Sequence, residues 1–224
     1  MNNLSHTQEY YLCAVSPKGG APTETVTVCL IISGVAELLR AGFLTRDEKK
    51  RLSIDNSKPW DNALPYLTPL YEKFIAAKKP QTIKDFIEKY KYSLDAYMSA
   101  IIDSLSAVGA IGEYEQKGFF TKKVKRIIQV PKQEATATVV EILRNEFLRN
   151  GELTDDTVIL AALLDKSGLL GSYFNKTETD ALKARMKEVR SSETYAAINK
   201  VLTDIDDDTA AIFTAVILPI ITNN

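Results

Sequence analysis

Few residues in this chain of 224 amino acids have the type and spacing that catalysis needs. The one histidine, His6, lies near the N-terminus in a segment that we expect to be mobile. A histidine-based metal site or a Ser-His-Asp triad would rest on that side chain alone. The turn at residues 17–20 lacks the Gly-Lys-Ser/Thr triplet that places a lysine on phosphate. The sequence therefore predicts a protein that is not an enzyme and has no cofactor.

Two cysteines and a glutamate lie in apolar surroundings and have a structural explanation. Cys13 and Cys29 have a spacing that suits no metal site, so we interpret them as reduced thiols of the core. Glu37 lies inside an apolar segment, where a carboxylate needs hydrogen-bond donors. We expect an arginine or a backbone amide to provide them.

Basic and aromatic residues gather in residues 116–130, which read QKGFFTKKVKRIIQV and hold no acidic residue. Phe119 and Phe120 follow Gly118 at a predicted turn, and the basic residues around them are Lys117, Lys122, Lys123, Lys125 and Arg126. Adjacent residues of a strand point to opposite faces, so the basic side chains do not all lie on one face. They cluster instead near one end of the predicted hairpin, which suits a tip that meets a charged plane. Such a tip could contact the protein's own core, another subunit, a nucleic acid or a membrane.

The rest of the chain, which must hold this tip in place, has mainly the apolar periodicity of helices. Residues 26–39 are apolar on most faces, as in a buried helix, and other segments carry one apolar stripe. Gly109 is expected to end a helix and Thr154 to cap one. The predicted helices cover residues 26–39, 82–90, 94–108, 140–147, 155–165, 182–189 and 195–205, and a final apolar helix follows.

Two segments interrupt the helical pattern, each after an apolar helix that ends at a glycine. Residues 43–54 predict a short β-hairpin, and residues 111–130 predict a longer one, because they are rich in good strand formers. Residues 55–70 hold three prolines and predict a loop packed by Trp60 and Tyr66. No low-complexity linker divides the chain, so we expect residues 1–224 to form one domain.

Composition and charge narrow the class of protein. The formal net charge is -1, so affinity for phosphate must come from a local patch. The N-terminal segment lacks the apolar core of a signal peptide, and the longest apolar run, residues 210–221, is shorter than the ~20 residues of a spanning helix. We therefore expect a cytoplasmic protein.

The helix before the longer hairpin argues against a nucleic-acid partner. A helix followed by a basic hairpin has the outline of a winged-helix domain, but SLDAYMSAIIDSLSAV holds no basic residue. Such a helix is poorly suited to a negatively charged groove. A winged-helix protein therefore ranks below a membrane-binding or self-associating one.

The order of motifs resembles the Golgi phosphoprotein 3 family. The likeness runs from about residue 7 to residue 221 and is carried by QEYYLCAVSPKGG, AELLRAGFL, SLSAVGAIGEYEQKGFF, TVILAALLDKSGLL and TAAIFTAVI. It implies a mainly α-helical bundle ringed by amphipathic helices, with one projecting hairpin. It also implies a peripheral membrane protein that binds phosphatidylinositol 4-phosphate, recruits protein partners and uses its hairpin for membrane contact and self-association.

The sequence differs from the family pattern at the phosphoinositide pocket. The corresponding positions hold Pro22, Ile31, Asp95 and Met98 in place of a tryptophan and three arginines. A pocket without those arginines loses its charge-assisted bonds to phosphate. The lack of a basic N-terminal extension favours a prokaryotic-type member.

From the residues and the resemblance together, we expect an adaptor that binds anionic phospholipid headgroups on the cytosolic face of a membrane. The residues expected to make this contact are Lys117, Gly118, Phe119, Phe120, Lys122, Lys123, Lys125 and Arg126. A scaffold that forms a homo-oligomer through the hairpin is the alternative. A protein partner of unknown identity is also expected.

Overall fold

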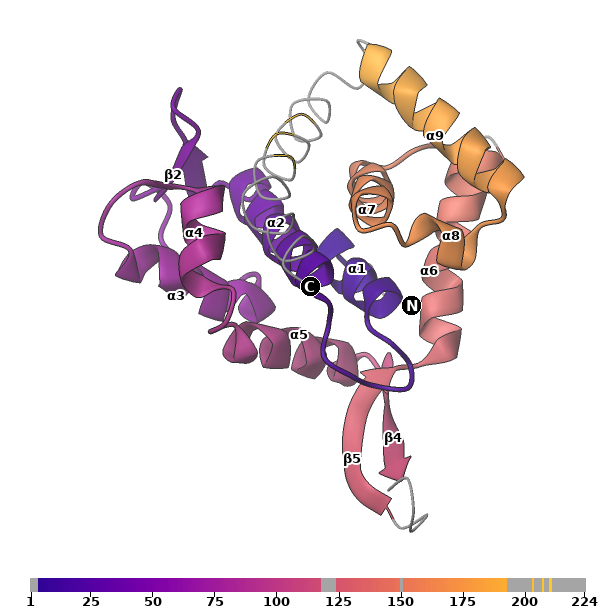
Figure 1. Ribbon diagram of the computed structural model, residues 1–224. Helices are drawn as coiled ribbons and strands as arrows, with labels where there is room; N and C mark the ends of the chain where they lie inside the picture. The colour runs from indigo at the N-terminus through magenta and orange to yellow at the C-terminus, as the bar shows by residue number, and fades with distance from the viewer. Residues whose placement is uncertain are drawn as a thin grey trace, which may run out of the picture.

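The structure is a computed structural model and describes residues 4–117, 124–149 and 151–192, together with Thr203, Asp207 and Ala210 (Figure 1). Most of these residues are helical, and two small antiparallel sheets complete the described part. The predicted mainly α-helical class with a β-hairpin is confirmed. Apart from those three single residues, the helices predicted at residues 195–205 and beyond lie outside the described ranges.

Three helices, α1 (His6–Ala14), α2 (Glu24–Arg40) and α7 (Asp155–Lys166), contact one another at the centre of the molecule. Residues 28–31 of α2 and 158–164 of α7 are fully buried, which agrees with their apolar sequences. The helical periodicity did not predict α1. Its residues are buried nearly all round, so no polar stripe reveals a helical period.

Amphipathic helices surround this centre, as predicted. α3 (Thr68–Ala76), α4 (Ile83–Tyr90) and α5 (Asp95–Ala107) lie on one side, and α6 (Gln133–Leu148), α8 (Leu170–Tyr173) and α9 (Lys176–Ser191) lie on the other (Figure 1). The longer ones bury a single stripe, for example Ile83, Phe86 and Ile87 of α4. The remaining faces of these helices meet solvent.

The proline-rich segment is more ordered than the predicted loop. It contains the 3-10 helix η1 (Pro65–Leu67) and leads directly into α3, which was not predicted. A proline lies in the first turn of each helix. Backbone N–H groups of the first turn have no acceptor within the helix, so the missing N–H of proline costs no hydrogen bond there. The predicted packing is confirmed, because the Trp60 ring stacks on Tyr71 with centroids 4.4 Å apart and Tyr66 is buried.

Both predicted hairpins are present. β1 (Leu44–Arg46) and β2 (Arg51–Ile54) form the short one, and β3 (Gln81–Thr82) extends it to three strands. β4 (Ile111–Lys117) and β5 (Val124–Pro131) form the long one. The backbone pairing of β3 with β2 joins segments far apart in the chain, which explains why no local pattern predicted it.

Gly109 ends α5 as predicted and starts the turn into β4. Its φ is +75°, a left-handed conformation that costs glycine little. The Ala110 amide donates to the Leu105 carbonyl at 2.9 Å, which is the bond of a Schellman motif. The same bond joins Phe43 to Leu38 at the end of α2, also at 2.9 Å. Each apolar helix thus releases the chain into a hairpin through the same helix-ending geometry.

Candidate functional site

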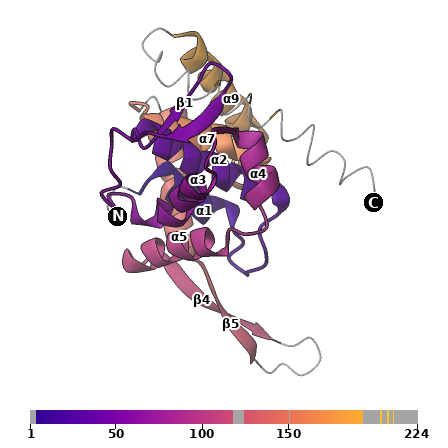
Figure 2. The ribbon, with the colours of Figure 1, turned by 90° about the vertical axis from the view of Figure 1, so that its left-hand side faces the viewer.

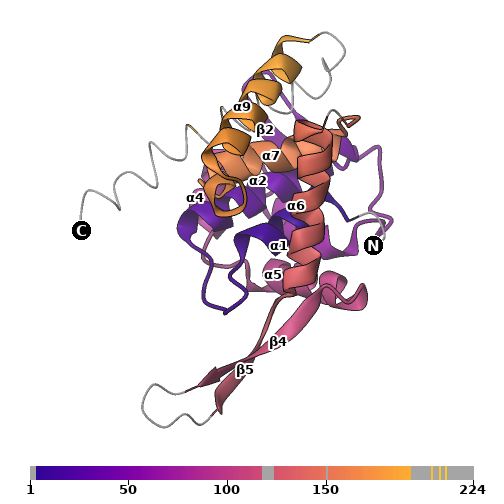
Figure 3. The same ribbon diagram turned by 90° about the vertical axis from the view of Figure 1, so that its right-hand side faces the viewer.

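The β4–β5 hairpin leaves the body beside the end of α5 and points away from the helices (Figures 2 and 3). Its register pairs Ile111 with Pro131 at the base and Lys117 with Val124 at the distal end, with a register shift between Gln116 and Lys117. At about 3.3 Å per residue, β4 extends roughly 20 Å. Among the described residues of the hairpin, Lys117 and Val124 therefore lie farthest from the core.

One face of the hairpin base packs against the loop that follows α1. A Cβ added at Gly19 would lie 1.8 Å from Cδ1 of Ile128 and 3.7 Å from Cγ1 of Val130. The loop backbone therefore approaches β5 directly, and Val130 is buried beneath it. The Lys132 amide also donates to the Ala110 carbonyl at 2.9 Å. These contacts hold the base of the hairpin in one orientation.

The opposite face of the hairpin is exposed and changes charge along its length. Glu113 pairs with Gln129 and Glu115 pairs with Ile127, and all four side chains face solvent. Ile127 is 58% exposed. Between Glu115 and Ile127 the sequence carries only basic charges. The hairpin strands are therefore acidic nearer the body and basic farther from it.

The structure places the backbone of three predicted contact residues. Lys117, Lys125 and Arg126 belong to the distal halves of β4 and β5. The other five, Gly118, Phe119, Phe120, Lys122 and Lys123, lie outside the described residues. Their role in binding remains a prediction.

His6 does not lie in a mobile terminus, and that prediction is wrong. It is the first residue of α1 and is fully buried. Ser5 caps the helix and forms a capping box with Gln8. The spacing of serine and glutamine, S-x-x-Q, is a known helix-start signal and could have revealed α1.

Both ring nitrogens of His6 face acceptors. Nδ1 lies 2.9 Å from Oδ1 of Asp156, and Nε2 lies 3.2 Å from the Ser33 carbonyl oxygen. The His6 ring therefore lies between α2 and α7 and contacts both helices.

Glu37 accepts a backbone hydrogen bond, as predicted. The Thr7 amide donates to Oε1 at 3.0 Å, and the Tyr66 hydroxyl donates to Oε2. His6 Nε2 lies 3.7 Å from Oε1. Arg40, the nearest arginine along the chain, instead pairs with Asp156. Glu37 thus joins α1, α2 and η1 in one buried polar network.

The pKa values of two carboxyl groups on α1 and α7 are shifted in opposite directions. The hydrogen bond from His6, helped by Arg40, lowers the pKa of Asp156 to about 2. Burial, with the charge of Asp156 adding to it, raises the pKa of Glu9 to about 7. Within the described ranges, no group of three His, Cys, Asp or Glu residues is arranged to hold a metal ion. The hydrogen bonds of His6 and Glu37 connect α1 to α2 and α7.

The two cysteines are free and buried, as predicted. Burial raises the pKa of Cys29 to about 11 and that of Cys13 well above its usual range. Both thiols are therefore protonated at neutral pH and are poor nucleophiles.

None of the helices in the described part of the chain is long and apolar enough to cross a bilayer. The body is helical and one hairpin projects from it (Figure 1). A family model described as Golgi phosphoprotein 3 (GPP34) matches residues 7–205. The chain belongs to the Golgi phosphoprotein 3 family. The match confirms the resemblance seen in the sequence, and it covers both the hairpin and Glu37.

A comparison with curated proteins finds no match. The four residues that we expect at the phosphoinositide pocket, from the resemblance, bring no positive charge. Ile31 is fully buried inside α2, and Asp95 is exposed in the first turn of α5. Pro22 and Met98 are half-buried.

Proposed function

We propose that this member of the Golgi phosphoprotein 3 family is a peripheral membrane adaptor that binds anionic phospholipid headgroups through the hairpin tip. The separation of charge along the ribbon carries the proposal. Glu113 and Glu115 lie on β4 nearer the body, whereas the stretch that follows them carries Lys117, Lys122, Lys123, Lys125 and Arg126. A ribbon with this polarity meets an anionic plane with its tip first, on the cytosolic face of a membrane.

The expected affinity is modest. Near an anionic surface each basic residue contributes about 1 kcal/mol, so five of them give a dissociation constant of roughly a millimolar or somewhat below. Phe119 and Phe120 add to this by entering the headgroup region. Self-association would strengthen binding further by presenting two tips to one membrane.

The binding depends on surface charge and not on one headgroup. The residues expected at the family's phosphoinositide pocket are Pro22, Ile31, Asp95 and Met98, and none of them is basic. Vesicles of equal surface charge should therefore bind alike, whether the charge comes from phosphatidylglycerol or from phosphatidylinositol 4-phosphate.

Sedimentation with vesicles tests the proposal. Vesicles of phosphatidylcholine alone, with phosphatidylglycerol or with phosphatidylinositol 4-phosphate are compared at low and high salt. Binding to both anionic types should fall with salt. It should also fall by about 30-fold when Lys122→Ala and Lys123→Ala are combined, from the loss of about 2 kcal/mol.

The control removes the same charge from another part of the molecule. Lys176→Ala with Lys187→Ala changes two exposed lysines of α9 and should leave vesicle binding within twofold. Equal losses for the two double variants, or no binding to any vesicle at low salt, would reject the proposed site. A marked preference for phosphatidylinositol 4-phosphate would indicate a specific pocket instead.

Self-association through the hairpin is the second candidate function. The observation that favours it is Ile127, an aliphatic side chain 58% exposed on the outer face of the ribbon. Analytical ultracentrifugation of wild type and Ile127→Ser distinguishes the two. A dimer that dissociates in the variant, without vesicle binding in either protein, would favour the scaffold.

A further inference from the structure

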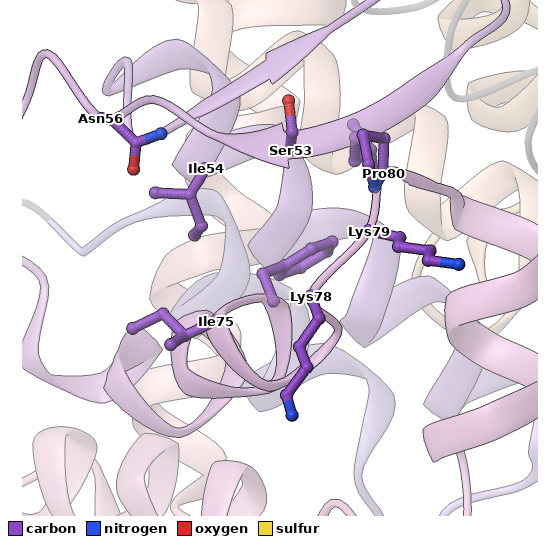
Figure 4. A pocket seen from close by; sticks show the side chains of 9 residues that line it. Ser53, Ile54, Asn56, Ile75, Lys78, Lys79 and Pro80 are labelled. Atoms are coloured by element: carbon purple, nitrogen blue, oxygen red, sulfur yellow. The ribbon is translucent and has the colours of Figure 1, made fainter.

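A hollow of about 300 Å³ opens between β2 and the C-terminal end of α3 (Figure 4). The loop from α3 to β3, which contains Lys78, Lys79 and Pro80, forms one side of it. This volume lies at the lower end of the range for binding pockets. It therefore suits one bulky side chain better than a whole cofactor.

The interior of the hollow is apolar. Leu52 and Phe74 are buried beneath it. Ile54 and Ile75 face each other across its opening (Figure 4). Ile75 is 58% exposed, although α3 buries its neighbours Tyr71 and Phe74. Exposed apolar side chains around a hollow mark the places where a partner can bury area.

The rim of the hollow is positively charged. Neither Lys78 nor Lys79 forms an ion pair with a residue that the structure describes, and no carboxylate lines the hollow. Lys78 has a φ of +57°, a left-handed conformation that glycine usually takes after a helix. The two ammonium groups extend in different directions (Figure 4). They are therefore not arranged around a single phosphate, and they fit separate carboxylates instead.

We propose that this hollow docks an extended peptide segment of a protein partner. The segment inserts one bulky apolar side chain between Ile54 and Ile75 and carries acidic residues on both sides of it. β2 lies toward the end of the molecule opposite the β4–β5 hairpin (Figures 1 and 3). The docking site therefore stays accessible when the hairpin meets a membrane, and it does not depend on lipid binding.

Fluorescence anisotropy with synthetic peptides tests the docking site without any membrane. Five labelled pentapeptides have two aspartates on each side of a central residue. The central residue is leucine, isoleucine, methionine, phenylalanine or tryptophan. At least one should bind the full chain with a dissociation constant below 1 mM. Matched peptides with serine in place of aspartate should bind at least tenfold more weakly, because they lack the charges that meet Lys78 and Lys79.

Two variants of the hollow and one control locate the binding. Lys78→Glu with Lys79→Glu should weaken the best peptide at least tenfold, and Ile75→Asp should do the same by removing the apolar contact. All three residues are exposed, so neither variant threatens the fold. Lys176→Glu with Lys187→Glu on α9 makes the same charge change elsewhere and should alter binding less than twofold.

The outcomes separate this docking site from the membrane function. No binding by any of the five peptides at 5 mM, or equal weakening by the hollow and α9 variants, would overturn the proposal. Loss of vesicle binding on reversal of Lys78 and Lys79, with no peptide bound, would assign the hollow to lipid and would also overturn it. Vesicle binding that fails while peptides bind would reject only the hairpin function.

Discussion

His6 Nδ1 lies 2.9 Å from Asp156 Oδ1, although 150 residues separate the two in the chain. The bond ties the first residue of α1 to the first turn of α7. Asp156 also accepts from Arg40 at the end of α2, so one carboxylate connects all three central helices. A negative charge in the first turn also favours α7 through the helix dipole.

Asp156→Asn should reduce stability in a pH-dependent way. The folded-state pKa of about 2 lies below the ordinary value of 3.8, so the ionised carboxylate stabilises the fold above about pH 4. That contribution disappears as the pH falls from about 4 to about 2. Because the side chain is 45% exposed, we expect a loss of only about 1 kcal/mol at pH 7.

Urea denaturation of wild type and Asp156→Asn at pH 7 and at pH 2.5 measures this effect. The difference should shrink toward the lower pH. Asp155→Asn is the matched control, because Asp155 is exposed and lies 3.7 Å from Arg40 Nη2. A loss of the same size at both pH values would contradict the role of Asp156 as an ionised acceptor.

Glu9→Gln should stabilise the protein at alkaline pH. Burial raises the folded-state pKa of Glu9 from 4.5 to about 7, so the protonated form favours folding at low pH. This advantage is lost between about pH 4.5 and 7, as the unfolded chain ionises first. Glutamine avoids the loss. The variant should match wild type near pH 4 and exceed it by about 2 kcal/mol at pH 8.

Chemical denaturation at the two pH values tests the Glu9 prediction. A variant less stable than wild type at pH 8 would show that the Glu9 carboxylate is ionised and paired in the folded state. A carboxyl NMR titration of Glu9 gives an independent reading, with a midpoint expected near pH 7.

Tyr66→Phe should destabilise the protein by about 1–3 kcal/mol, the cost of leaving a buried polar atom unpaired. Tyr66 donates to Oε2 of Glu37, which is only 6% exposed. Urea denaturation at pH 7 measures the change. Tyr92→Phe serves as the control, because Tyr92 is 82% exposed and should be neutral. Equal stabilities for the two variants would show that the Tyr66–Glu37 hydrogen bond contributes nothing to stability.

Gly109→Ala should cost about 1 kcal/mol through backbone strain alone, because an alanine at positive φ is disfavoured. A Cβ at this position meets no atom within 4 Å. Gly171→Ala in α8 is the matched control, with equally open space and no positive φ. Thermal denaturation compares the two. A Gly109→Ala variant as stable as Gly171→Ala would exclude a left-handed helix end.

Much of the fold could be predicted because its signals are local. The stripe of Ile83, Phe86 and Ile87, the cap at Thr154 and the helix end at Gly109 each depend on residues within one or two turns. The hairpin that carries the candidate site could be predicted for the same reason. Its strand formers lie on either side of one turn and pair with each other.

The elements that sequence alone did not reveal depend on distant partners. α1 has no polar stripe because α2, α6 and α7 cover it, and β3 is two residues long and exists through its pairing with β2. His6 is a terminal histidine in the sequence and a buried bridge in the fold. The chain by itself determined α2, α4, α5, α6, α7 and α9 and the polarity of the hairpin, since those follow from periodicity and local backbone preference. Only the tertiary structure decided which side chains meet, because burial and long-range contacts arise when the helices pack.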